Sequence, residues 1–189
     1  ITTDNTTSVT LALTTGTGTL SGTVNKTAVS GIADFAGLGL SIQLTGADKV
    51  LTASGTYTAA TTAAFTITNA AANKLAVTGE PTASTVAGVA FATQPIVTVQ
   101  DTYGNTVTGD TSLVTLTLTT GTGTLSGTAS MNAVAGIANF TGKGMSIDLV
   151  GADKVLTAAG SYTSATTAAF TITVAAANKL AVTTEPSAS

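Results

Sequence analysis

Apolar and polar residues alternate with a period of two along several short stretches of this chain. In residues 113–119, Val114, Leu116 and Leu118 alternate with threonines. The same pattern recurs at residues 74–78, 95–101 and 170–174. Strict alternation predicts strands that bury one face and expose the other to water. Glycine, proline and asparagine mark turns between them, so the pattern predicts a β-sandwich or a barrel.

The chain also repeats itself. Residues 8–84 align with residues 113–189 at a constant offset of 105, and about 58 of the 77 positions are identical. A period of 105 is too long for a solenoid, whose units span about 20–50 residues. It is the size of one immunoglobulin-type sandwich. We therefore expect an all-β chain of tandem immunoglobulin-like β-sandwich repeats.

The frame of the repeat predicts three segments. Residues 1–71 form a partial repeat that lacks its first strands, residues 72–175 form a complete repeat, and residues 176–189 form the first strand of a following repeat. We expect the natural protein to continue at both ends. A partial repeat leaves apolar edges unpaired, which favours strand donation by a neighbour.

Composition narrows the class of protein. Only 8% of residues are charged, 43% are hydrophobic, threonine fills roughly a quarter of the chain, and the net charge is −3. Disordered chains combine low hydrophobicity with high net charge, so we predict order. The six basic residues are too few for the clustered basic surface that nucleic-acid binding requires. No apolar run is long enough to span a membrane. The absence of cysteine excludes a disulfide framework, and the first residues lack a leader pattern.

Three motifs carry a resemblance to a known family. They are Lys74–Pro81, Asp101–Val107 and the alternating Phe170–Thr173. In this order they resemble the bacterial immunoglobulin-like (Big-type) tandem repeats of large surface adhesins. The resemblance implies an extracellular location and a role as a spacer, or as material of filaments and surface layers. The chain departs from many such repeats at Gln100, where an acidic residue is common, which weakens an inherited calcium site.

Oxygen-bearing side chains offer one candidate metal site. Asp101, Asn105 and Asp110 fall in one predicted loop, and Glu80 lies near the predicted junction between repeats. Calcium prefers such oxygen ligands. The first copy has Asn5 at the position of Asp110, and an Asx-capped turn explains the same residues. We therefore predict no cofactor, with calcium as the open alternative.

Other candidate chemistry is sparse. The glycine-rich residues 16–22 match neither phosphate-binding fingerprint and predict a turn. Lys49 and Lys154 each follow an aspartate, which suggests a solvated turn or, alternatively, a buried lysine for an isopeptide crosslink. Without histidine there is no ordinary base for nucleophilic catalysis, so we predict no enzyme. Tyr57 and Tyr162 are expected to be core residues at a corner.

The sequence thus predicts a structural function. The residues that carry this function are expected to be the apolar core positions that stabilise each sandwich. They include Val97, Val99, Leu116, Leu118, Ile137, Phe140, Phe170 and Ile172. Expected partners are neighbouring repeats and, in a filament or sheath, identical chains. The alternative is an adhesin module that binds a glycan, ice or a host protein. Rows such as Thr115, Thr117 and Thr119 resemble ice-binding arrays, although the solvated face of a strand explains them as well.

Overall fold

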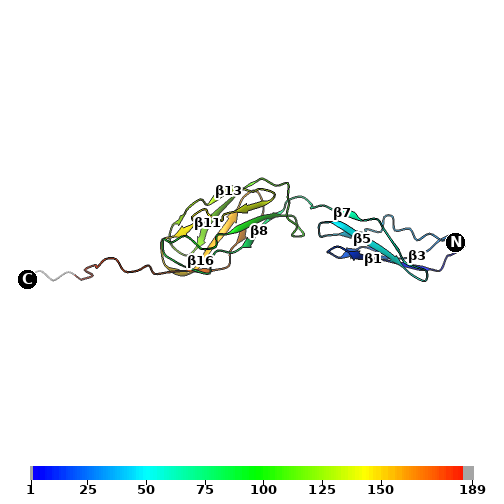
Figure 1. The fold of residues 1–189 in the computed structure, drawn as a ribbon, viewed down its shortest axis with the longest axis horizontal. Helices are drawn as coiled ribbons and strands as arrows, with labels where there is room; N and C mark the ends of the chain where they lie inside the picture. Colours follow the sequence, from blue (N-terminus) through cyan, green and yellow to red (C-terminus); the bar gives the residue numbers. More distant parts are fainter. Residues whose placement is uncertain (1, 185–189) are drawn as a thin grey trace, which may run out of the picture. The chain divides into compact units, whose positions relative to one another are not determined.

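The structure, a computed structural model, describes residues 2–184 and is all-β over that range (Figure 1). The chain forms two compact units. The first runs to Lys74 and also contains Val99–Asp110 and Val134–Gly136, and the second holds the remainder. No helix in the described residues is long and apolar enough to cross a membrane. The predicted domain limits after residues 71 and 175 stay a prediction.

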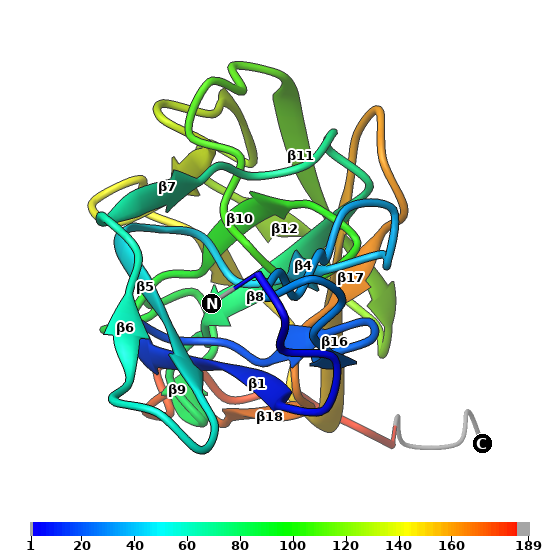
Figure 2. The ribbon, with the colours of Figure 1, turned by 90° about the vertical axis from the view of Figure 1, so that its right-hand side faces the viewer.

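The first unit is built on one sheet. Its order is β3-β1-β5-β6, with β7 paired to β5, and β2 and β4 form a separate pair (Figure 2). The strands are β1 Ser8–Thr15, β2 Leu20–Ser21, β3 Asn25–Thr27, β4 Ser41–Ile42, β5 Gly46–Ser54, β6 Ala60–Thr61 and β7 Phe65–Ile67. Of residues 16–22, predicted to form a glycine-rich turn, residues 16–19 connect β1 and β2, whereas Leu20–Ser21 form β2 itself.

The second unit has two sheets, of orders β14-β10-β8 and β13-β11-β16-β18-β9, with β17 paired to β16 and β12 to β15. The strands are β8 Lys74–Gly79, β9 Ser84–Val86, β10 Ile96–Gln100, β11 Leu113–Thr120, β12 Leu125–Ser126, β13 Ser130–Asn132, β14 Ile137–Asn139, β15 Ser146–Ile147, β16 Gly151–Ala159, β17 Ala165–Thr166 and β18 Phe170–Thr173. Two sheets, with the first strand β8 in one and the last strand β18 in the other, are the immunoglobulin-like arrangement. The predicted fold class is confirmed.

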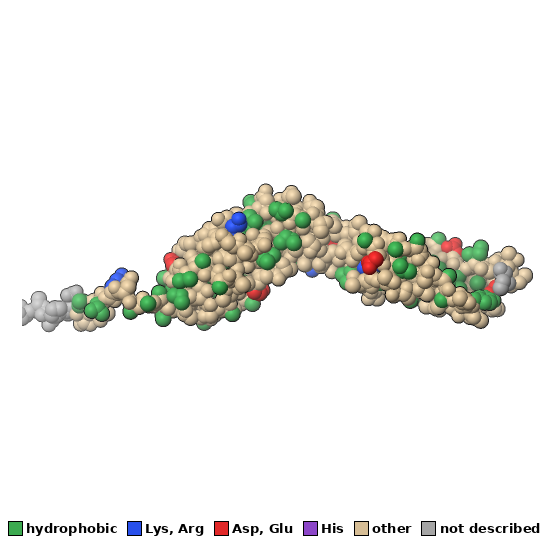
Figure 3. Space-filling view, in the orientation of Figure 1, with side chains coloured by type: hydrophobic (Ala, Val, Ile, Leu, Met, Phe, Trp, Pro, Cys, Tyr) green, Lys and Arg blue, Asp and Glu red, His purple; other side chains and the backbone are tan. Residues whose placement is uncertain are grey.

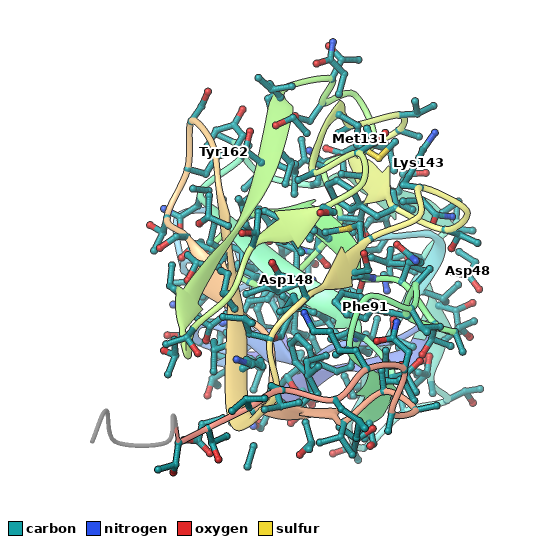
Figure 4. All side chains as sticks on the ribbon, turned by 90° about the vertical axis from the view of Figure 1, so that its left-hand side faces the viewer. Asp48, Phe91, Met131, Lys143, Asp148 and Tyr162 are labelled. Atoms are coloured by element: carbon teal, nitrogen blue, oxygen red, sulfur yellow. The ribbon has the colours of Figure 1, made fainter. Side chains whose placement is uncertain are left out.

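The core of the second unit is tightly closed. Phe91, which Figure 4 labels, is 2% exposed and contacts Phe170 edge to face, with ring centroids 5.3 Å apart. Most predicted core residues are buried, while Leu118 is half-buried; the buried members are Val97, Val99, Leu116, Phe140, Phe170 and Ile172. Apolar alternation therefore located most of the interior.

At three residues the observed burial differs from the predicted alternation. Ile137 is 39% exposed, because Ala138 and Phe140 share the inward face of this segment and leave Ile137 outside. Val174 is 76% exposed, since β18 ends at Thr173. Thr98, expected on a wet face, is 4% exposed and donates its hydroxyl to Thr78 Oγ1 at 2.8 Å, because β10 is the middle strand of its sheet.

The first unit has the same sheet but leaves its apolar face less covered. Leu51, Phe65 and Ile67 are half-buried, whereas their counterparts 105 residues later are 0%, 3% and 2% exposed. In the second unit the covering residues come from the segment before β11, including Leu75 and Phe91.

Candidate functional site

The loop that follows β10 is held together by one buried aspartate. Asp101 Oδ1 accepts hydrogen bonds from the backbone nitrogens of Tyr103 and Asn105, both at 2.9 Å. Such bonds to the residues that follow are the reason why aspartate begins turns. Gly104 adopts φ +90°, a left-handed conformation that glycine accepts without strain. The predicted Asx-type turn at Asp101–Asn105 is therefore present.

The same loop is hydrogen-bonded to strand ends of the first unit, to which it belongs. Asp101 Oδ2 accepts from Ala70 N at 3.0 Å. The Asn105 amide donates to Gln43 O at 2.8 Å, and its oxygen accepts from Thr45 N at 3.1 Å. Asp101 is 0% exposed and Asn105 8%. Residues 101–105 thus act as a polar clamp, a term used below for Asp101 and Asn105 with these backbone partners.

The electrostatics of the clamp favour an ionised Asp101. Burial raises the pKa of Asp101, but hydrogen bonds from the Asn105 amide and from the backbone nitrogens of Ala70, Asn105 and Tyr103 outweigh burial, so its pKa lies below its ordinary value. Both carboxylate oxygens are engaged by N–H donors. In this geometry both oxygens are occupied as acceptors, three of the donors being backbone N–H groups and one the Asn105 amide.

The other residues of the suggested calcium site lie elsewhere. Glu80 Oε2 accepts from Ala168 N at 3.0 Å in the second unit. Asp110 takes part in the backbone turn after the clamp, where its nitrogen donates to Val107 O at 2.9 Å. Over residues 2–184 no group of three or more Asp, Glu, His or Cys side chains could hold a metal ion. Calcium binding remains an expectation from the sequence alone.

The expectation of a solvated turn at Lys49 and Lys154 is wrong. The two lysines are 1% and 0% exposed. Lys49 Nζ donates to Thr17 O at 2.5 Å and to Thr17 Oγ1 at 3.3 Å. Lys154 Nζ donates to Thr122 O and to Val150 O, the latter at 3.2 Å. Each ammonium is thus satisfied by a carbonyl oxygen of the turn after β1 or β11, and Lys154 also by Val150 O directly before β16. The hydrogen bonds of these two ammonium groups involve no carboxylate or carboxamide, which an isopeptide crosslink would need.

Two glycines leave the space that each buried lysine side chain occupies. A Cβ placed on Gly121 would lie 2.7 Å from Lys154 Cδ, and one on Gly151 would lie 2.9 Å from Lys154 Nζ. Gly16 and Gly46 stand in the same relation to Lys49. A signal for this was present in the sequence. The two copies share this lysine and both glycines, whereas Lys26 is replaced by Met131 and Leu38 by Lys143.

The threonine rows are hydrogen-bonded across strands. Thr119 Oγ1 lies 2.7 Å from Thr157 Oγ1, and the equivalent Thr14 and Thr52 are also 2.7 Å apart. These hydroxyls are exposed, and charged side chains are sparse over the side of the molecule that Figure 3 shows. The pairs supply the polar surface that the low charge content cannot.

Two apolar hollows lie on the first unit. One of about 200 Å³ is lined by residues that include Leu40, Leu51 and Phe65. The other, of about 180 Å³, is lined by Thr7, Val9, Ala53, Ser54, Gly55, Tyr57, Thr58 and Ala60. Tyr57, predicted to be a core residue, is 57% exposed and donates to Asp4 Oδ2 at 3.2 Å, while Tyr162 is half-buried. Sequence patterns did not indicate these hollows.

Comparisons with known proteins identify no family for the chain. No protein-family model matches it, and no curated protein matches it. Among solved structures, the D0–D1 domain of intimin is similar at 17% identity and a TM-score of 0.37, over 91% of this chain and 83% of that one. A β-glycosidase from Bacteroides vulgatus is similar at 13% identity and a TM-score of 0.43, over 87% of this chain. This chain spans only 21% of that glycosidase.

Proposed function

We propose that this chain is extracellular structural material, a stalk or spacer built from serial β-sandwich units and usable as subunit material of a filament or sheath. The observation that carries the proposal is the pairing of β9 with β18 in the second unit. These are strands near the two chain ends of that unit, and they run parallel, with Thr171, Ile172 and Thr173 opposite Ser84, Thr85 and Val86.

The parallel pairing of β9 and β18 resists tension for a geometric reason. Force applied at the two ends of the unit pulls β9 and β18 in opposite directions along their axes. Their hydrogen bonds are then loaded together in shear, instead of opening one after another. The bonds include Thr171 N to Ala83 O at 3.0 Å and Ala87 N to Thr173 O at 2.9 Å. The Thr173 hydroxyl adds a bond to Thr85 O at 3.2 Å.

Single-molecule pulling of the full chain tests this proposal. We expect one high-force event that releases roughly 90 residues, or about 310 Å at ~3.5 Å per residue. Ala87→Pro removes the N–H that bonds Thr173 O and should lower this force, while Ala90→Pro, at an exposed position outside the strands, serves as the matched control. Extension of the second unit at negligible force, or equal forces for both variants, would exclude a tension-bearing role.

The extracellular location needs a separate test. Antibody labelling of intact cells of the source organism, combined with protease treatment of the cell surface, should detect and remove the protein without lysis. Protection from both reagents until the cells are lysed would refute the location.

A further inference from the structure

Each unit buries one lysine ammonium among neutral oxygen atoms. Lys154 is 0% exposed, and its Nζ donates to Thr122 O and to Val150 O, the latter at 3.2 Å. Lys49, its counterpart 105 residues earlier, is 1% exposed, and its Nζ donates to Thr17 O at 2.5 Å. A buried ammonium ion is stable only where hydrogen bonds replace those it made to water. The carbonyl oxygens of these turns therefore act as ligands of a cation.

The acidic residue next to each lysine points away from the ammonium. Asp48 and Asp153 are exposed, whereas the lysines that follow them are buried. Successive residues of a strand point to opposite faces of the sheet, which explains this separation. The hydrogen-bond acceptors of the two ammonium groups are backbone carbonyls and one threonine hydroxyl. Each positive charge is thus bound by oxygen dipoles.

In the second unit these carbonyls lie at an irregular point of the sheet. Thr122 lies in the turn after β11, and Val150 directly precedes β16. The register between these two strands shifts between Leu118 and Thr120. A register shift of this kind leaves backbone groups outside the regular ladder, so they can turn toward another partner. The two carbonyls therefore converge on one ammonium at the end of the strand pair.

Glycine backbone encloses the rest of the lysine side chain. A Cβ placed on Gly121 would lie 2.7 Å from Lys154 Cδ, and one on Gly151 would lie 2.9 Å from Lys154 Nζ. The first copy repeats this arrangement, with 2.7 Å from a Cβ on Gly16 to Lys49 Cδ. Gly16 and Gly121 adopt φ of +88° and +87°, which glycine accepts without strain. The space left beside these glycines fits a narrow, unbranched alkylammonium.

We propose that the turn after β11 is a binding site for a primary alkylammonium ion, and that Lys154 is a ligand which the chain itself supplies. The turn after β1 is the equivalent site for Lys49. The carbonyl oxygens recognise the charge and the N–H donors, while the covalent link to the strand only delivers them. A chain with a shortened lysine therefore binds a free alkylammonium ion in the same place. This site is independent of the stalk role, because it needs neither tension nor a partner chain.

Chemical rescue of the full chain tests the site. Lys154→Ala removes the ammonium and most of the alkyl chain, and ethylammonium carries the atoms that correspond to Cδ, Cε and Nζ. Urea unfolding should show a lower midpoint for this variant than for the unaltered chain. Ethylammonium chloride should raise that midpoint saturably toward the original value, because a ligand that binds only the folded state stabilises it. Lys143→Ala, at an exposed lysine, is the matched control and should not respond in this way.

Three other additives identify what the site recognises. Tetramethylammonium chloride has the charge without N–H donors, ethanol has the shape without the charge, and sodium chloride supplies ionic strength alone. None of them should raise the midpoint of Lys154→Ala more than that of Lys143→Ala. The proposal is overturned if tetramethylammonium or ethanol rescues Lys154→Ala as well as ethylammonium does, or if ethylammonium acts equally on both variants.

A measurement on the unaltered chain decides the matter if Lys154→Ala does not fold. The chain has six lysines and no arginine, so the side-chain ammonium signals of nitrogen-15-labelled protein can be counted directly. Exposed ammonium protons exchange rapidly with water, whereas those of Lys49 and Lys154 should exchange slowly enough to be observed. Coupling across the hydrogen bond should connect Lys154 Nζ with the Thr122 carbonyl carbon. If no ammonium signal of the unaltered chain disappears in Lys154→Met, the carbonyls do not bind this cation and the proposal is wrong.

Discussion

Removal of the Asn105 side chain is the sharpest test of the polar clamp. Asn105→Ala deletes three hydrogen bonds, to Gln43 O at 2.8 Å, to Asp101 Oδ2 at 2.9 Å and from Thr45 N at 3.1 Å. Each is worth about 0.5–1.5 kcal/mol net, and their buried partners lose a hydrogen-bonding group. We expect the free energy of unfolding of the first unit to fall by about 2–4 kcal/mol.

Hydrogen exchange followed residue by residue is the appropriate assay, because it reports on the clamp itself. The Thr45 amide bonds directly to Asn105, so its exchange should accelerate by roughly 30- to 1000-fold if local opening is governed by the lost free energy. The Ala70 amide should follow, because its acceptor Asp101 loses a partner.

Two further variants make the result interpretable. Thr102→Ala, at an exposed position of the same loop, should leave both exchange rates unchanged. Asn105→Asp keeps the shape but places a second carboxylate against Asp101, and should destabilise at least as much as alanine at neutral pH. If the Thr45 amide exchanges at the same rate in Asn105→Ala and in the unaltered chain, the clamp does not hold this strand end and the reasoning is wrong.

Three other predictions concern stability. Lys154→Met keeps the length of the side chain but leaves Thr122 O and Val150 O without a donor, and should cost about 1–3 kcal/mol in urea unfolding, while the exposed Lys143→Met should cost nothing; equal midpoints would contradict a structural role for the ammonium. Phe91→Ala should lower the stability of the second unit by about 3–5 kcal/mol in calorimetry, and a loss below ~1 kcal/mol would contradict its place in the core. Because the pKa of Asp101 is lowered from 3.8 in the folded state, its contribution is complete above about pH 4 and is lost as the pH falls through the lower folded value; Asp101→Asn should reduce this acid sensitivity, and unchanged acid unfolding would refute it.

Alternation and turn chemistry were sufficient to predict the fold class. Threonine and valine fit a pleated surface, and the period-two pattern at residues 113–119 identified β11 as a strand with one buried face. The prediction of burial failed where it depends on the position of a strand in its sheet. Thr98 is buried because β10 lies between β14 and β8, and a single sequence does not reveal which strand is in the middle.

The polar sites were harder to predict, for a different reason. Asp101 and Asn105 were identified in one loop together with Asp110, but their partners include backbone atoms of residues 43, 45 and 70, and such partners leave no side-chain pattern in a sequence. For Lys154 a solvated turn was preferred over a buried side chain because lysine is almost never fully buried. The space for it comes from Gly121 and Gly151, which are distant from one another in sequence and meet only when β11 and β16 pair.

The two copies also show that burial is decided by the surroundings and not by the residue. Phe65 and Phe170 occupy the same register, opposite Lys49 and Lys154 respectively, yet only Phe170 reaches 3% exposure. The sheet therefore forms from its own strands in both units, with the same register shift after Leu13 and after Leu118. In the second unit the apolar face of this sheet is covered by residues such as Leu75 and Phe91, which are 4% and 2% exposed. The strands of the sheet therefore fix its register, while the segments packed on its apolar face decide how deeply each residue is buried.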